Sequence, residues 1–202
     1  MPSGDDAAAR GGDAPGRPGR VSAPGLLVRH AGHGDVAPLV GIRTHYVLHT
    51  HSAFDTVPPS EDDVRDWLAR FDEATAHQLL VAVRDGEMLG YAATLRYRPK
   101  PAFDATVEMS VYLAPGRTAA GVGSALYREL LARSAAYGTR TWLAGVALPN
   151  DASLAFHRKH GFEVVGTFVD YARKWDRDIS TTWLQRTLPA RAAGPPAGGS
   201  PA

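Results

Sequence analysis

A strand, a loop of small residues and a helix follow one another directly between residues 104 and 137, and this succession constrains the fold more than any other segment. The stretch DATVEMSVYLA (104–114) alternates in polarity with the period of two that a β-strand requires. The residues of its apolar face are Val107, Met109, Val111 and Leu113, and those of its polar face are Thr106, Glu108, Ser110 and Tyr112. We therefore predict a strand with one face in the core and a carboxylate, Glu108, on the other.

The loop after this strand has almost no side-chain bulk, and the helix predicted over about 121–137 begins on two glycines. The first N–H groups of a helix lack intrahelical partners, and the aligned peptide dipoles place partial positive charge there. Gly121 and Gly123 leave these N–H groups open to an oxyanion, and Ala119 and Ala120 obstruct little. The loop is thus a candidate phosphate site, although the same two glycines can serve only a tight turn.

Two familiar phosphate-binding motifs do not fit this loop. A P-loop needs a Lys followed by Ser or Thr after its second glycine, and the stretch GVGSAL contains no Lys. A dinucleotide-binding fingerprint needs a third small residue at the position of Leu126. The neighbouring segments must therefore decide what the loop holds.

The remaining segments define the fold class. Apolar spacing predicts helices over 35–48, with Asp35 as the cap, and over about 61–71, after the capping pattern that runs from Ser60 to Asp63. Residues 78–98 predict two strands joined by a hairpin turn at Asp85-Gly86. Further strands are predicted at 26–30, 141–148, 162–169 and 179–188, with a helix over 151–160 that ends at Gly161. The order βααβββαβαββ is typical of an α+β domain with a mixed, mostly antiparallel central sheet and helices on both faces.

Length and composition indicate one domain with two tails. A chain of 202 residues, 44% of them hydrophobic, can bury one core. Residues 1–25 contain ten Gly or Pro and a single β-branched residue, Val21, and residues 189–202 are similar in character. Such segments cannot bury enough apolar surface to offset the entropy of ordering. We therefore expect disordered tails at 1–25 and 189–202 around a folded domain at 26–188.

Charge and cysteine content narrow the partners and the compartment. The net charge is +1 and the 22 basic residues are spread along the chain, so neither a nucleic acid nor an anionic membrane is an expected partner. The absence of Cys excludes thiolate chemistry and fits a reducing compartment. The N-terminal stretch lacks the apolar segment of a secretory signal. We expect a cytoplasmic protein that acts on small molecules.

Four stretches carry a family resemblance: YVLHTHSAFDTVPPSEDDVRDW, YRPKPAFDATVEMSVYLAP, GVGSALYRELL and ALPNDASLAFHRKHGF. Together with the segment order they resemble the GNAT-type N-acetyltransferases over residues 26–188, and among these the phosphinothricin (glufosinate) N-acetyltransferase branch. The resemblance implies an enzyme that transfers an acetyl group directly from acetyl-CoA to the primary amine of a small, amino-acid-like substrate. Methionine sulfone or sulfoximine is an alternative acceptor, and an acyl-CoA-binding regulatory module with little turnover is an alternative of another class. Relatives in this branch are commonly dimers, so a homodimer is an option.

The resemblance assigns two catalytic residues. Glu108 matches the glutamate that serves as general base in this branch, and such a base is needed because only a neutral amine attacks a thioester. His157 stands where many members of the superfamily carry a Tyr thought to protonate the departing thiolate, and imidazole can exchange a proton near neutral pH. The alternatives are a half-exposed strand glutamate without a role and a histidine that packs between helix and sheet.

The resemblance also places acetyl-CoA along the chain. Backbone groups of Val111, Tyr112 and Leu113 would bind the pantetheine amides in the manner of an added strand, and a backbone N–H near Val111 would face the developing oxyanion. Asn150 would contact the pantetheine arm, cap the following helix, or do both. The pyrophosphate would lie on the loop and helix start, which comprise Ala119, Ala120, Gly121, Val122, Gly123 and Ser124.

Two departures from the family concern binding. The loop reads Thr118-Ala119-Ala120 where relatives carry long polar or cationic side chains, so we expect acetyl-CoA to bind less tightly by about 1 kcal/mol for each lost contact with phosphate. Arg98 and Lys100 match a basic pair that would hold an acidic substrate, but Phe103 replaces a Tyr of the relatives. The alternative for this second segment is a solvated loop.

We predict no metal site. His45 and His49 have the spacing of two metal-binding histidines on one helix face, but Tyr46 follows His45, so the H-E-x-x-H motif is absent.

Overall fold

A seven-stranded sheet forms the centre of the computed structural model, which describes residues 25–117 and 121–189. The strand order is β1-β2-β3-β4-β5-β7-β6. All neighbouring strands are antiparallel except β4 and β5, which are parallel. The strands are β1 (Leu27–His30), β2 (Leu79–Arg84), β3 (Glu87–Arg96), β4 (Thr106–Leu113), β5 (Thr141–Ala147), β6 (Glu163–Lys174) and β7 (Arg177–Thr187).

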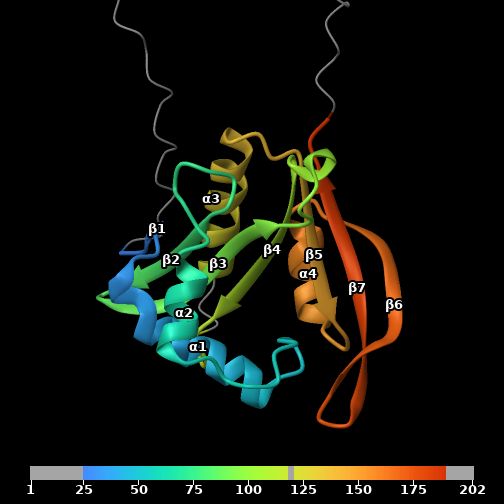
Figure 1. Ribbon diagram of the computed structural model, residues 1–202, viewed down its shortest axis with the longest axis horizontal. Helices are drawn as coiled ribbons and strands as arrows, with labels where there is room; N and C mark the ends of the chain where they lie inside the picture. Colours follow the sequence, from blue (N-terminus) through green and yellow to red (C-terminus); the bar gives the residue numbers. More distant parts are fainter. Residues whose placement is uncertain (1–24, 118–120, 190–202) are drawn as a thin grey trace, which may run out of the picture.

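In the part of the chain that the structure describes, four α-helices cover the two faces of the sheet (Figure 1). The helices α1 (Val36–His49) and α2 (Glu61–Leu68) pack on one face, and α3 (Val122–Ala136) and α4 (Asp151–Lys159) pack on the other. Two short 3₁₀ turns, at His33–Asp35 and Pro101–Phe103, complete the described structure. The predicted element order and the predicted mixed, mostly antiparallel sheet with helices on both faces are confirmed.

The alternation of β4 divides the interior into two cores. Val107 and Met109 are buried against α3, together with the fully buried Leu126 and Trp142. On the opposite face Tyr112 packs with the core that α1 and α2 form over β2 and β3. Because β4 lies between both cores, any residue at its end is held from two sides.

Local sequence signals explain where several elements begin. The Ser60 hydroxyl accepts a hydrogen bond from the Asp63 N–H at 3.1 Å, and the Asp63 carboxylate accepts one from the Ser60 N–H at 2.8 Å, so the predicted capping pattern is a capping box. Asp85 and Gly86 both have positive φ angles, of 50° and 80°, as a two-residue hairpin turn of the favoured twist requires.

Three predicted details differ in the structure. Asp35 stands at the start of α1, but its side chain makes no cap; it accepts instead from the Gly32 N–H at 2.8 Å and pairs with Arg29 at 2.6 Å. Helix α2 ends at Leu68 rather than near residue 71. Strand β6 extends to Lys174, five residues beyond the predicted end at 169, because β7 pairs with it up to the hairpin turn. None of these differences changes the topology.

Apart from residues 118–120, the predicted domain at 26–188 lies within the described residues, whereas residues 1–24 and 190–202 of the predicted tails lie outside them. Among the described residues, no helix is long and apolar enough to cross a membrane.

Candidate active site

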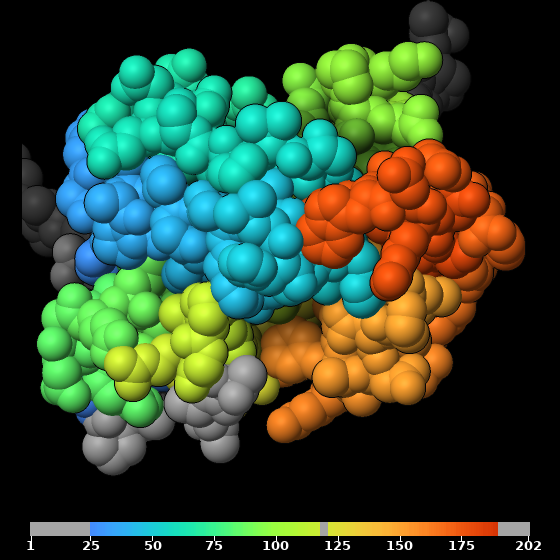
Figure 2. All heavy atoms as spheres, turned by 90° about the horizontal axis from the view of Figure 1, so that it is seen from below, coloured from blue at the N-terminus to red at the C-terminus, as the bar shows by residue number. Residues whose placement is uncertain are grey.

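The sheet opens between its two parallel strands. Residues 106–108 of β4 pair with residues 141–143 of β5, and beyond Glu108 and Leu143 the two strands separate. The ends of both strands then line a cavity of about 280 Å³, which α4 closes on one side. Figure 2 shows this hollow between the yellow segment at the start of α3 and the orange segments of β5 and α4. The opening lets a long ligand pass between the two halves of the sheet.

The end of β4 presents backbone groups to this cavity. Val111, Tyr112 and Leu113 line it; the family resemblance predicts these residues to bind pantetheine, and that role stays a prediction. On their other side these residues pair with β3, from Ala92 to Gly90, while the ladder to β5 has already ended. Alternate N–H and C=O groups of the strand are therefore left to bind an extended ligand as a further strand would.

The start of α3 reaches the same cavity through Gly123. A Cβ atom at this position would lie 3.4 Å from the Phe156 ring and 3.9 Å from Leu113, so Gly123 permits the close approach of helix, strand and α4. Gly121 has a φ angle of 101°, which favours glycine. Val122 is buried in the core, and the Ser124 hydroxyl lies 3.1 Å from His160 Nε2. The predicted contacts at Ala119 and Ala120 lie outside the described residues.

Asn150 begins the helix that closes the cavity. Its Oδ1 accepts a hydrogen bond from the Ser153 N–H at 3.1 Å, so it is the N-cap of α4, and it lines the cavity as well. Its Nδ2 lies 3.4 Å from the hydroxyl of Ser52, in the loop after α1. Asn150 therefore joins the α1–α2 loop to α4 at the rim of the cavity.

His157 lies deeper on α4 and is 5% exposed. It lines the cavity, with the rings of Tyr127, Phe156 and Phe162 packed around it at centroid distances of 5.5 to 5.7 Å. Its Nδ1 lies 2.7 Å from the Ser153 carbonyl oxygen, which can only accept, so Nδ1 carries the proton and donates it. Burial lowers the pKa of His157, so the ring is neutral near pH 7 and Nε2 is an acceptor.

Glu108 lies at the point where β4 and β5 separate, on the face of the sheet that α1 and α2 cover. Its side chain reaches solvent, yet the surrounding protein atoms exclude enough water to raise the pKa of Glu108 above its ordinary value. Ser110, the next residue on this face, lines the cavity. Glu108 itself lines neither cavity. A carboxylate with a raised pKa next to the cavity wall can take up a proton from a ligand there, directly or through water.

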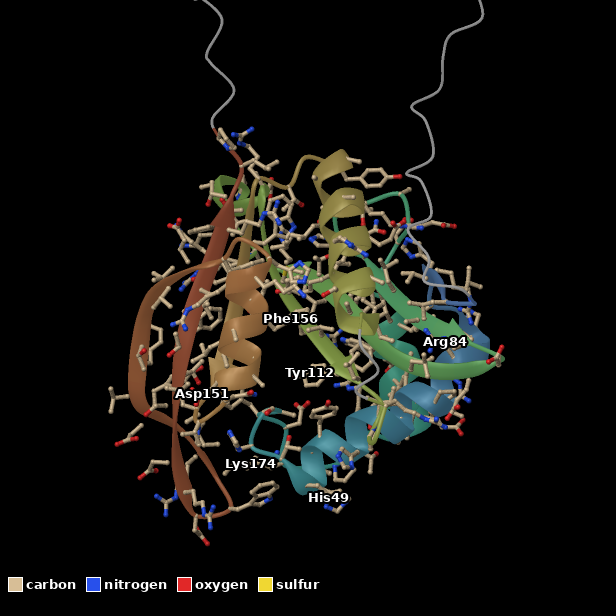
Figure 3. The ribbon with its side chains drawn as sticks, turned by 180° about the vertical axis from the view of Figure 1, so that it is seen from behind. His49, Arg84, Tyr112, Asp151, Phe156 and Lys174 are labelled. Atoms are coloured by element: carbon tan, nitrogen blue, oxygen red, sulfur yellow. The ribbon has the colours of Figure 1, made fainter. Side chains whose placement is uncertain are left out.

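A second cavity, of about 160 Å³, adjoins the first on the α1 and α2 face. Tyr46, Ser110 and Tyr112 line both cavities, so they stand between them. The Tyr46 hydroxyl donates to the Leu113 carbonyl at 3.0 Å, and the Tyr112 hydroxyl donates to the Ser52 carbonyl at 3.3 Å. Burial raises the pKa of Tyr112 to about 12, so this phenol keeps its proton. Figure 3 labels Tyr112 of β4 and Phe156 of α4, which both line the first cavity.

The segment predicted to bind an acidic substrate lies elsewhere. Arg98, Lys100 and Phe103 belong to the connection between β3 and β4, and none of them lines either cavity. The Arg98 guanidinium lies over the rings of Tyr97 and Phe103, at 5.1 and 5.9 Å from their centroids. Within one described chain, the structure does not bring this segment to the other predicted site residues, and its binding role stays a prediction.

Three residues that line the first cavity were not predicted from the sequence: Tyr46, Ser52 and Phe156. Tyr46 and Phe156 lie in predicted helices, and Ser52 lies in a polar connection, so no local motif distinguishes them. The pairing of Tyr46 with Leu113, 67 residues away, is a tertiary contact that no local pattern contains.

No group of three His, Cys, Asp or Glu side chains among residues 25–117 and 121–189 could hold a metal ion.

Comparison with known proteins identifies the family. The model of the acetyltransferase (GNAT) family matches residues 44–162. A phosphinothricin N-acetyltransferase of Streptomyces coelicolor is 39% identical over 165 residues, which are 81% of this chain and 96% of that protein. An L-methionine sulfoximine/L-methionine sulfone acetyltransferase of Pseudomonas paraeruginosa is 31% identical over 82% of this chain and 97% of its own length.

A solved structure supports the same assignment. The phosphinothricin acetyltransferase of Sinorhizobium meliloti, crystallised in complex with AcCoA, superposes with a TM-score of 0.78 at 30% identity, over 87% of this chain and 95% of that one. The family match, the relatives and the opening between β4 and β5 agree. The chain is an N-acetyltransferase of the GNAT family.

Proposed function

We propose that this enzyme transfers the acetyl group of acetyl-CoA to the primary amine of a small, amino-acid-like acceptor of the phosphinothricin type. The observation that carries the proposal is the position of Glu108, whose pKa burial raises, at the point where β4 and β5 separate and two residues before Ser110, which lines both cavities. The printed activities of the relatives favour amines of amino-acid analogues.

The residues around the opening fit acetyl-CoA, which supplies a thioester as the activated acetyl donor. The backbone of Val111 to Leu113 has free hydrogen-bonding groups for the pantetheine amides. The N-terminus of α3, from Gly121 to Ser124, would bind the pyrophosphate together with Ala119 and Ala120. Gly123 supports this fit, because a side chain there would crowd the space beside Phe156. Asn150 would contact the pantetheine arm from the rim.

Glu108 would act as the general base. The acceptor amine is protonated near neutral pH and must lose a proton before its nitrogen lone pair can attack, and Glu108 would receive that proton directly or through water. The amide bond forms as the bond to sulfur breaks, without a covalent enzyme intermediate. Tyr46 and Tyr112, which keep their phenolic protons, hold the end of β4 and the α1–α2 loop in place around the reacting groups.

His157 remains the predicted donor to the departing thiolate, but its surroundings favour a different role. Donation from Nε2 needs a doubly protonated ring, and burial lowers the pKa of His157. A neutral ring held by Ser153 through Nδ1 offers an acceptor at Nε2, which can orient a hydroxyl or amide donor at the cavity wall. The proton for the thiolate can then come from solvent.

The test follows release of free thiol from acetyl-CoA in the presence of phosphinothricin, methionine sulfone, methionine sulfoximine and common amino acids. Glu108→Gln should lower kcat/KM about 100- to 1,000-fold on the best acceptor, as the loss of a general base does. Glu163→Gln, an exposed glutamate at the start of β6, is the matched control and should behave as wild type.

The outcomes separate the alternatives. Equal rates for wild type and Glu108→Gln would remove Glu108 from the base role. Turnover of methionine sulfone but not of phosphinothricin would favour the second substrate class, which the Pseudomonas relative represents. Binding of acetyl-CoA without turnover of any amine would favour a regulatory module.

We also propose that the enzyme forms a homodimer and works in the cytoplasm. Strand β6 is the outer strand of the sheet, and several of its large apolar side chains are exposed, including Val165, Phe168 and Val169. An exposed apolar edge of this kind is typical of a surface that pairs with another chain. The cytoplasm is proposed because acetyl-CoA is a metabolite of that compartment.

A further inference from the structure

The wall of the second cavity contains one partly buried cation and one buried tyrosine that the proposed chemistry does not use. The cation is Arg43, on α1, and the phenol is Tyr91, on β3. The cavity shares Ser110 and Tyr112 with the first, so a molecule that occupies it lies next to the place where the acetyl group would be transferred.

Arg43 is held in place without using its hydrogen-bond donors. Its guanidinium carbon lies 4.5 Å from the centre of the Trp67 ring, and Nη2 lies 3.6 Å from Oδ2 of Asp55. The Arg43 side chain is 19% exposed, whereas that of Asp55 is 62% exposed, so the carboxylate partner is mostly in water. Within the described residues Arg43 makes no hydrogen bond at normal distance, in contrast to Arg29, whose two terminal nitrogens both donate to Asp35 at 2.6 and 2.9 Å.

Tyr91 adds a second unused donor. The residue as a whole is only 3% exposed, but its hydroxyl is not one of the fully buried polar atoms, and it makes no side-chain hydrogen bond with any described residue. Burial raises the pKa of Tyr91 well above its ordinary value, so the hydroxyl keeps its proton. A phenol in a cavity wall with its proton unused can donate a hydrogen bond to a ligand or to water there.

Charge and size together indicate what the second cavity binds. A guanidinium that lies over an aromatic ring and is partly desolvated binds a carboxylate or a similar oxyanion more strongly than an exposed one does. A volume of about 160 Å³ is well below the ~300 Å³ at the lower end of typical ligand pockets, so it suits one acidic group with a few carbon atoms. Asp55 also lines the cavity, but its side chain is mostly in water, and it contacts the guanidinium only at Nη2, so the other N–H groups of Arg43 are left without a partner among the described residues.

We propose that Arg43 and Tyr91 bind the acidic group of the acceptor and make the enzyme selective for amines that carry a carboxylate or another compact oxyanion. The inference rests on the proposed acetyl transfer, and it names side chains of α1 and β3 for a role that the sequence had assigned to Arg98 and Lys100. The oxyanion is either the α-carboxylate or an acidic group on the side chain, and the two share the same chemistry.

The experiment compares matched acceptors with matched variants. The acceptors are the best amino acid found for the wild type, its α-carboxamide, and an analogue whose side-chain acid is replaced by a neutral group. The variants are Arg43→Gln and Tyr91→Phe, with Arg43→Lys to retain the charge. Arg65→Gln is the matched control for Arg43, because Arg65 lies on α2 and pairs with Glu61 and Asp62 at the surface. Tyr137→Phe, at the exposed C-terminal end of α3 and outside both cavities, is the control for Tyr91.

We expect Arg43→Gln to lower kcat/KM for the amino acid on the order of 10- to 100-fold and Tyr91→Phe to lower it about 3- to 10-fold, as the loss of charged and neutral hydrogen bonds predicts. The analogue that lacks the recognised acidic group should lose less than about twofold, which identifies the α-carboxylate or the side-chain acid as the ligand of Arg43. KM for acetyl-CoA should not change, and both controls should resemble wild type.

Equal losses on charged and neutral acceptors, or no loss on either, would overturn the inference. Thermal unfolding of each variant shows whether Arg43→Gln lowers activity only because it destabilises the fold. If it does, the kinetics of Tyr91→Phe and Arg43→Lys on charged and neutral acceptors test the inference in its place. Calorimetric titration of wild type with the amino acid, in the presence of CoA, separates this inference from the proposed function. Binding that depends on Arg43 without turnover would support the site and refute acetyl transfer, whereas the absence of both binding and turnover would refute both.

Discussion

Glu108 combines solvent access with incomplete hydration. A general base needs solvent access so that the proton it takes up can leave. It benefits from incomplete hydration because this raises its pKa and brings its basicity closer to that of the amine. The same environment acts on stability. The raised pKa of Glu108 means that folding favours the protonated carboxyl over the ionised one. Glu108 therefore contributes most to the free energy of unfolding below the ordinary pKa of glutamate, and this contribution is lost as the pH rises through the pKa of the folded state.

We therefore predict that Glu108→Gln stabilises the fold at neutral pH while it impairs catalysis. The amide has the size of the carboxyl group and no charge to desolvate. The midpoint of thermal unfolding, measured from neutral pH down to the ordinary pKa of glutamate, should lie above that of wild type at neutral pH and converge with it on acidification. A constant difference at all pH values would show that the ionisation of Glu108 is not its source.

The sequence predicted some of these residues and could not predict others. The alternation of β4 placed Glu108 and Val111 on opposite faces, because a period of two is a local property of a strand. Arg43 looked like one of many polar positions on a helix, and only the arrangement of Trp67 and Asp55 around it distinguishes it. His157 was predicted from the resemblance, but its tautomer and lowered pKa depend on burial and on the Ser153 carbonyl.

At the scale of elements, the β6–β7 hairpin fixes the loop that contributes to both cavities. Lys174, at the end of β6, is 3% exposed, and its ammonium donates to the carbonyl oxygens of Thr50 and Ala53 at 3.0 and 2.6 Å. Figure 3 shows Lys174 beside the cyan loop that follows α1. The same loop supplies Ser52 to the first cavity and Asp55 to the second. One buried cation thus ties the outer hairpin to the walls of the site.

Replacement of this cation should loosen the loop. Lys174→Met keeps the length of the side chain but removes the donors to two carbonyl groups, and we expect a loss of about 1–3 kcal/mol in the free energy of unfolding. We also expect a higher KM for the acceptor, because Asp55 and Ser52 lose their support. Urea titration and steady-state kinetics measure both effects. Arg173→Ala, which removes an exposed side chain on the same strand, is the control, and equal effects of the two changes would contradict the anchoring role.

At the scale of the whole molecule, the order of the elements and the hairpin turns could be predicted from the sequence, because helix caps, turn glycines and polarity periods are each set by residues close together in the chain. The separation of β4 from β5 was not, since it depends on a parallel pairing between strands that are joined through α3. The extension of β6 to Lys174 likewise depends on its register with β7.

The proposed homodimer makes a prediction at this same scale. Val169 is 73% exposed on the outer strand β6, and Leu27 is 41% exposed on β1, at the opposite edge of the sheet. Val169→Glu should convert a dimer into monomers, because a charge in an apolar interface must be desolvated, whereas Leu27→Glu should leave the dimer intact. Light scattering coupled to size-exclusion chromatography measures the mass. A wild-type monomer, or a Val169→Glu dimer, would exclude β6 as the interface.

The divergence of β4 and β5 also bears on how this enzyme can evolve. The groups that the divergence exposes are main-chain N–H and C=O groups, which every residue type except proline carries in full. Substitutions along β4 can therefore change side chains without deleting the contacts proposed for the donor substrate. On the face with α1 and α2, side chains such as Arg43 form the cavity wall, so substitutions there can adapt the enzyme to a different acceptor. The β4 part of the proposed donor site is therefore robust to mutation, in contrast to Gly123, and new specificities can arise on the acceptor side.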